Sequence, residues 1–258
     1  SFLDSNENWK DSFTRAFVWS RFWFKKWAWC ESLGLQSWTK EQQVAFLIRL
    51  PFNKDIWSRA NQLLGQQSDL FWQQVPVNPW RALDDAMEAA SELLAHGRSK
   101  GAIDCLACLK HEDRLFSTSL ALQAILEYNP AIERPDQLTH HNITDLIAWL
   151  QSQPDTDLVK LGQAELRYLD LLDHSRGAAP KTLEQRLAND PEFFSEVIQR
   201  CYGPEKEREE PSLTEEQKRL ALISYRLLHR WHTVPGMNLR TSEFLPEAYT
   251  AWMNEALR

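Results

Sequence analysis

Residues 78–110, NPWRALDDAMEAASELLAHGRSKGAIDCLACLK, indicate the class of fold. Apolar side chains recur there every three or four positions, as on one face of a helix; they are Leu83, Ala86, Met87, Ala90, Leu93 and Leu94. Asn78-Pro79 opens the expected helix and His96-Gly97 ends it, since proline suits a first helical turn and glycine suits the residue after the last. Residues 98–110 are its expected partner. The stretch therefore predicts a pair of helices.

The same signals recur along the chain. Thr39 to Gln42 and Thr214 to Gln217 both have the capping-box pattern, in which a threonine begins a helix and a glutamine three residues later returns its hydrogen bond. Alternating β-branched runs are almost absent, whereas leucine, alanine, glutamine and glutamate are plentiful. We predict an all-α protein of about a dozen helices, arranged as an irregular α-solenoid or helical-repeat array; a compact helical domain is the alternative.

One segment has the composition of a linker. Residues 203–216, GPEKEREEPSLTEE, are charged, poor in aliphatic side chains and rich in proline. We therefore predict a helical array over residues 1–202, a charged linker or loop over 203–216, and C-terminal helices over 217–258 that continue the array.

The net charge, the N-terminal segment and the cysteines limit the kind of protein that this chain can be. A net charge of −7 and a pI near 5.6 disfavour a general nucleic-acid binder. Four basic residues interrupt the apolar N-terminal segment, so no membrane-spanning helix or signal peptide is expected, and a cytoplasmic location is predicted. The cysteines, four in all, do not suggest a disulfide framework. Because the sequence lacks an initiator methionine and stops within a helical pattern, we expect a fragment of a longer protein.

The N-terminal stretch 15–31, RAFVWSRFWFKKWAWCE, is unusually aromatic. On a helical wheel one arc is predicted to face the core; it holds Trp9, Phe13, Phe17, Trp19, Trp23, Phe24 and Trp27. The opposite arc mixes basic with apolar side chains, and part of it is the predicted partner surface: Arg21, Phe22, Lys25, Lys26 and Trp29. Packing against a neighbouring helix is the preferred interpretation. A surface for a protein partner, an anionic membrane or single-stranded nucleic acid remains the alternative.

Candidate ligands for chemistry are few. Cys105, Cys108 and His111 are spaced three residues apart on one helix face, but zinc usually takes four ligands from two segments, so we predict buried packing there. The pairs His140-His141 and His229 with His232 are assigned structural or surface roles. The sequence therefore predicts no catalytic, cofactor or metal site, and a chain that is not itself an enzyme.

Five stretches resemble helical regions of very large bacterial proteins that carry ATPase modules elsewhere, including antiphage STAND-type NTPases. They are LPFNKDIWSRANQLLG (50–65), FWQQV (71–75), ASELLAHGRSKGAIDCL (90–106), APKTLEQRLANDPEFFSEVIQRCY (179–202) and YRLLHRWHTVPGM (225–237). The resemblance spans residues 40–258 and implies a non-catalytic scaffold or sensor region that binds a protein partner or other domains of its own chain. An accessory domain of an enzyme is the alternative function.

Overall fold

The computed structural model describes residues 8–174, 179–202, 214–230, 235–238, 241 and 243–256. The chain divides into two compact units, Ser1–Leu146 and Ile147–Arg258, which we call unit 1 and unit 2. Helices form almost all of the regular structure in the described ranges, which confirms the predicted all-α class. The one sheet found in these ranges is a short antiparallel hairpin in unit 2.

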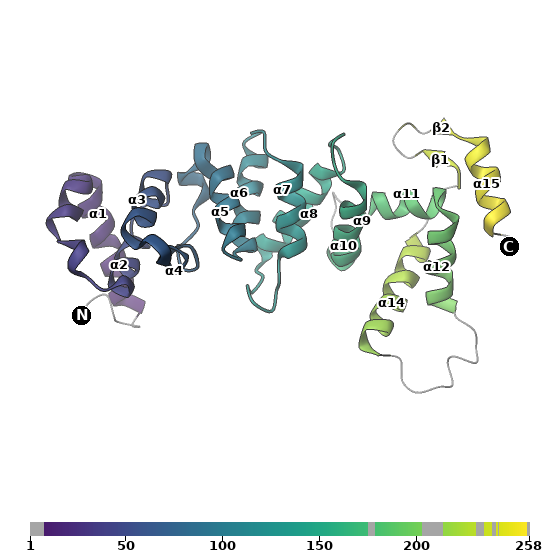
Figure 1. The fold of residues 1–258 in the computed structure, drawn as a ribbon. Helices are drawn as coiled ribbons and strands as arrows, with labels where there is room; N and C mark the ends of the chain where they lie inside the picture. The colour runs from purple at the N-terminus through teal and green to yellow at the C-terminus, as the bar shows by residue number, and fades with distance from the viewer. Residues whose placement is uncertain are drawn as a thin grey trace. The chain divides into compact units, whose positions relative to one another are not determined.

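Unit 1 is built from consecutive helices, coloured purple to teal in Figure 1. These are α1 (Asn8–Ser32), α2 (Lys40–Leu47), α3 (Lys54–Leu64), α4 (Asp69–Trp72), α5 (Ala86–Ala95), α6 (Ser99–His111) and α7 (Thr118–Glu127), followed by α8 (Gln137–Leu150), which crosses into unit 2. Short 3-10 turns lie between them at Leu35–Ser37, Gly65–Gln67, Pro79–Arg81 and Leu83–Asp85.

The pair α5 and α6 is the helix pair expected from residues 78–110, and it packs closely. Leu93 and Cys105 are fully buried. Gly97 takes a φ of 70°, which ends α5 and lets the Arg98 amide donate back to the Leu93 carbonyl at 2.7 Å. Gly101 permits the close approach, because a methyl group there would lie 3.2 Å from Leu93 Cδ1 of α5 and 2.9 Å from Val77 Cγ2.

The start of α5 differs from the prediction. Residues 79–85 form two 3-10 turns, and α5 begins only at Ala86. Ala82, at φ −130° and ψ 33°, separates the two turns, and the Asn78 side chain caps neither of them. The apolar period at 83–94 predicted most of the buried face, but Met87, which it included, is 48% exposed. Pro79 marked a turn that precedes the helix.

Unit 2 contains the remaining elements, coloured teal-green to yellow in Figure 1. They are α9 (Leu158–Arg167), α10 (Leu169–His174), α11 (Lys181–Asn189), α12 (Pro191–Tyr202), α14 (Glu215–Arg230), β1 (Met237–Asn238), β2 (Glu243–Phe244) and α15 (Pro246–Ala256). Its core gathers leucines, a phenylalanine and a valine from several helices: Leu169, Leu183, Leu187, Phe193, Val197 and Leu227.

The predicted linker does not separate two compact units. Most of 203–216 lies outside the described residues, but α12 before it and α14 after it pack together within unit 2. The boundary between units falls instead between Leu146 and Ile147, inside α8. Both residues are fully buried, and no proline or glycine marks this position.

Candidate binding surface

Helix α1 is not one regular helix. Lys26 has a φ of 50° and a ψ of −151°, a conformation that breaks the helical course between residues 25 and 27. Side chains other than glycine rarely adopt this region of backbone space. A helical wheel drawn through the whole segment therefore misplaces the residues that follow Lys26.

The buried face of α1 is opposite to the predicted one. Phe22, expected on the outer arc, is buried, and so is Val18 one turn before it. Phe13, Phe17 and Phe24, expected in the core, are 59%, 46% and 79% exposed.

The tryptophans of the predicted core stripe do not support the prediction either. Trp23 is also exposed, Trp19 and Trp27 are partly buried, and the Trp9 side chain lies outside the described residues. A wheel shows correctly which residues share a face, but it cannot show which face the rest of the chain covers. The predicted core stripe was therefore wrong.

The exposed phenylalanines follow a regular pattern. Phe13, Phe17, Ser20 and Phe24 are spaced by four, three and four residues, which is the spacing of a helix seam that packs against a second helix. The rings of Phe13 and Phe17 stack with centroids 6.4 Å apart. We call these three phenylalanines the aromatic stripe.

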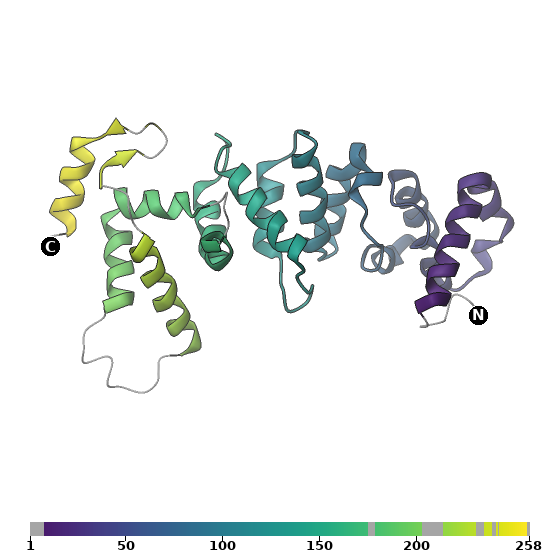
Figure 2. The ribbon, with the colours of Figure 1, turned by 180° about the vertical axis from the view of Figure 1, so that it is seen from behind.

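A groove lies beside one end of the aromatic stripe. Its volume is about 380 Å³, and it is lined by side chains that are apolar except for one threonine: Phe13, Thr14, Phe17, Val18, Trp29, Leu33, Trp38 and Phe46. Trp29 packs on Phe17 and on Phe46 of α2, with ring centroids 6.5 and 5.7 Å apart. Figures 1 and 2 show α1 beside α2 at the N-terminal end of unit 1. The groove thus combines both halves of α1 with the segment that follows.

Cationic side chains flank the stripe. The Arg21 guanidinium lies over the Phe17 ring at 5.5 Å, and the Lys26 ammonium lies over the Trp23 ring at 4.7 Å. Arg15 and Lys25 are also exposed, and the sequence from Ser12 to Cys30 contains no aspartate or glutamate. The surface around the stripe is therefore locally basic although the whole chain is acidic.

The predicted partner surface is only partly at the surface. Arg21, Lys25 and Lys26 are exposed, and Trp29 is half-buried in the groove wall. Phe22 is 5% exposed and packs edge-on against Trp27, with ring centroids 5.5 Å apart, so it is not available to a partner. The sequence reasoning missed the aromatic stripe as a surface; its four-three-four spacing shows that the rings share one helix face, but not that this face is exposed.

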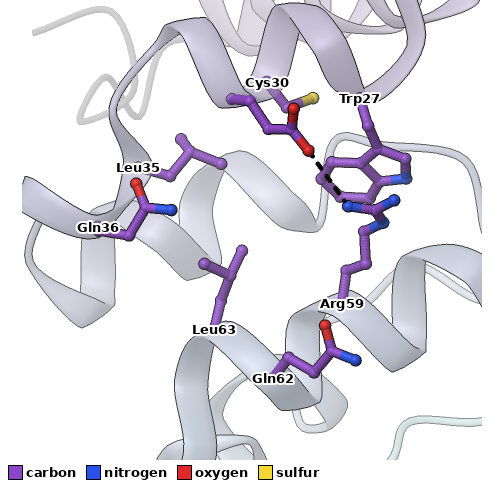
Figure 3. A pocket seen from close by; sticks show the side chains of 8 residues that line it. Trp27, Cys30, Leu35, Gln36, Arg59, Gln62 and Leu63 are labelled. Atoms are coloured by element: carbon purple, nitrogen blue, oxygen red, sulfur yellow. Dashed lines mark ion pairs between the residues drawn. The ribbon is translucent and has the colours of Figure 1, made fainter.

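A smaller cavity of about 200 Å³ lies between the end of α1 and α3 (Figure 3). The Arg59 guanidinium packs over the Trp27 ring at 4.5 Å and pairs with Glu31 at 3.5 Å and Asp55 at 3.6 Å. The Trp27 indole donates to the other carboxylate oxygen of Asp55. Burial raises the pKa of the Cys30 thiol to about 11.

The side chains around the cavity of Figure 3 hold α1 and α3 together and do not form a reactive site. The Cys30 thiol stays protonated at neutral pH and is a poor nucleophile. The Arg59 cation is balanced by two carboxylates, so it does not attract an anion. The cluster joins the second half of α1 to α3.

Cys105, Cys108 and His111 do share one side of α6, but they do not form a ligand set. Both cysteines are buried, and burial raises the pKa of each thiol. His111 is turned toward Trp80, with ring centroids 5.5 Å apart. Among the described residues, no group of three or more histidine, cysteine, aspartate or glutamate side chains is placed to hold a metal ion.

A cavity of about 390 Å³ lies between residues 77–80, α6 and α8, and His141 is among its lining residues. Its carboxylates already have partners. Asp104 accepts from Asn142 at 2.9 Å, and Asp145 pairs with Lys110 at 2.6 Å. The site therefore resembles an interhelical polar contact more than a binding pocket.

Two other histidines that were assigned structural or surface roles lie at the surface. His140 is exposed, as is His229, which stacks on Tyr225 with ring centroids 5.8 Å apart. His232 lies outside the described residues.

No family model, curated protein or solved structure matches the chain. In the part of the chain that the structure describes, no helix is long and apolar enough to cross a membrane. The resemblance to STAND-type NTPases accordingly stays a prediction. The aromatic stripe and its groove are the surface feature from which a function can be argued.

Proposed function

We propose that the chain is a non-catalytic helical module that docks a protein partner on the aromatic stripe and groove of α1. The observation that carries the proposal is that Phe13, Phe17 and Phe24 face solvent with the spacing of a packed helix seam. Burying a phenylalanine is worth about 1.5–3 kcal/mol, so leaving several exposed on one face is costly unless a partner covers them.

The composition of this surface supports the proposal. Aromatic side chains and arginine are enriched among the residues that dominate binding energy at protein interfaces. Here Arg21 lies over Phe17, and the half-buried Trp29 lines the adjoining groove. The opposite side of the helix is packed into unit 1, because Val18 and Phe22 are buried there. Such a surface can bind without a conformational change of its own backbone.

The sequence resemblance adds a biological setting to this proposal. A bacterial parent protein and a role as the sensor or scaffold region in antiphage defence are proposed on that resemblance alone. The proposed cytoplasmic location rests instead on the basic residues that interrupt the apolar N-terminal segment.

Selection of peptides from a random-sequence display library tests the proposed function. We expect enriched peptides to bind the wild-type chain and to lose at least about tenfold in affinity for the double variant Phe17→Ser, Phe24→Ser, since two contact rings are removed. The matched control is Leu115→Ser with Ile132→Ser, because these apolar side chains of unit 1 are also exposed but lie outside α1. Library peptides that bind both double variants equally well, or no enrichment at all, would contradict the proposal.

A further inference from the structure

We infer that the partner docking on α1 is an acidic amphipathic helix, with aliphatic side chains against the aromatic stripe and carboxylates against Arg21 and Lys25. This inference rests on the proposed function and specifies the chemistry of its partner. It follows from the shape of the stripe, the sign of the flanking charges and the charge of the whole chain.

The shape of the stripe favours a helix as the occupant. Phe24 follows Phe13 by eleven positions, which at 1.5 Å per residue is about 16 Å, or three helical turns. Ser20 lies between Phe17 and Phe24 in the seam and leaves room there for a side chain of a partner helix. Alternating large and small side chains along a seam suit the knobs-into-holes packing of two helices.

The groove lies next to one end of the aromatic stripe and could hold one side chain of a partner helix. Trp29, Trp38 and Phe46 come from three successive segments and form a recess of about 380 Å³ next to Phe13 and Phe17. A bulky apolar side chain of the partner helix fits such a recess, as an anchor residue does in a helix-binding groove. A flat lipid surface would leave the recess unfilled.

The flanking charges favour an acidic helix. Arg21 occupies the seam-flanking position that follows Ser20, and Lys25 lies one turn later on the same side. Residues flanking a seam set the choice of partner through charge pairing. Glu31 and Asp55 pair with Arg59, and no ion pair joins Arg21 or Lys25 to a carboxylate of the described residues.

The same charges disfavour a second copy of this chain. A two-fold pairing of the stripes would bring equivalent basic flanks together, and like charges across a helix seam repel. Extended polyanions are disfavoured by the net charge of −7, since a membrane or nucleic acid reaches far beyond the local basic patch. A single acidic helix can stay within that patch.

Two synthetic peptides of about three heptads test the inference with the full chain. Both carry leucine at the seam positions; one carries glutamate and the other lysine at the flanking positions. We expect fluorescence anisotropy at low salt to show the glutamate peptide binding about tenfold more tightly than the lysine peptide. Its glutamates are attracted to Arg21 and Lys25, whereas the lysines of the other peptide are repelled by them.

Charge reversal supplies the decisive control. Arg21→Glu with Lys25→Glu should weaken the glutamate peptide about tenfold and strengthen the lysine peptide correspondingly. Lys218→Glu with Arg219→Glu changes the net charge equally on an exposed part of α14 and should leave both affinities unchanged. Circular dichroism establishes that each variant is folded.

The alternative outcomes separate the two proposals. If both peptides bind equally and both lose affinity with Phe17→Ser, Phe24→Ser, the acidic partner is wrong while docking on the stripe stands. If neither peptide binds, the inference is overturned, and the library selection decides the proposed function independently. Tight, salt-sensitive binding of phosphatidylserine vesicles or single-stranded oligothymidine that needs Arg21 and Lys25, or dimers at low salt that need Phe17 and Phe24, would also overturn it.

Discussion

Glu165 carries a carboxylate at a fully buried position of unit 2. Its oxygens accept hydrogen bonds from the backbone amides of Thr182 and Leu183 at 3.1 and 2.9 Å, and from the Gln151 side chain at 2.8 Å. These amides belong to the first turn of α11, where Pro180 offers no side-chain cap. Glu165 therefore caps a helix from a distance of 17 residues along the chain.

Replacing Glu165 by glutamine should destabilise unit 2. The amide retains one acceptor but turns a donor toward backbone N–H groups, so the free energy of unfolding should fall by about 1–3 kcal/mol. Urea denaturation followed by circular dichroism measures this change. Glu196→Gln is the matched control, because Glu196 is exposed and pairs with Arg200 one turn away on α12; a change below about 0.5 kcal/mol is expected there.

The pH dependence of this difference has a definite sign. Burial, opposed by the hydrogen bonds, raises the pKa of Glu165 above its ordinary value of 4.5. The folded state therefore binds the proton more tightly than the unfolded state does, and the resulting stabilisation is fully present below pH 4.5 and is lost as the pH rises through the folded pKa. Wild type should exceed Glu165→Gln in stability by more at low pH than at neutral pH. The opposite trend would contradict a raised pKa.

At the scale of the element, local signals were predicted well. Thr39 and Gln42 exchange the two capping-box hydrogen bonds at 3.1 and 3.3 Å, and Thr214 and Gln217 do so at 2.9 and 3.2 Å. Asn53 caps α3 through the Ile56 amide at 3.0 Å. Partners within three residues of each other form these caps, so the sequence contains all of the information they need.

The orientation of α1 could not be predicted in the same way. The wheel grouped Phe13, Phe17 and Phe24 correctly, but burial of Val18 and Phe22 depends on contacts with the rest of unit 1. The conformation of Lys26 carries no sequence signal either, because lysine is a good helix former. Glu165 escaped prediction for the same reason, since its partners are far away in sequence.

Because the backbone at Lys26 is not helical, replacement by glycine should have opposite effects on stability at residues 25 and 26. Lys26→Gly should raise the free energy of unfolding of unit 1 by about 1 kcal/mol, because glycine adopts a φ of 50° without strain. Lys25→Gly, one residue earlier within the helical course, should lower it by about 1 kcal/mol. Both variants remove one positive charge. Urea midpoints compare them directly, and equal destabilisation by both would show that residue 26 is helical in solution.

At the scale of the whole molecule, the division into units falls at Leu146 and Ile147, whereas composition marked residues 203–216 as a charged linker or loop. Composition reports where a segment cannot form a core, as at 203–216. A unit is defined instead by which helices share a core, and α11, α12 and α14 contribute jointly through Leu187, Val197 and Leu227. The placement of that boundary therefore depends on long-range contacts, which one sequence does not contain.

Two separate cores imply that local destabilisation should stay within its own unit. Glu165 accepts hydrogen bonds from Gln151, Thr182 and Leu183, which all belong to unit 2, so Glu165→Gln should raise amide hydrogen exchange in α9 and α11 by about tenfold while α5 and α6 remain unchanged. Leu93→Ala, which empties a fully buried site on α5, should do the reverse. Mass spectrometry of peptic fragments measures both. Equal acceleration in α6 and α11 by either variant would show that the units unfold as one cooperative block.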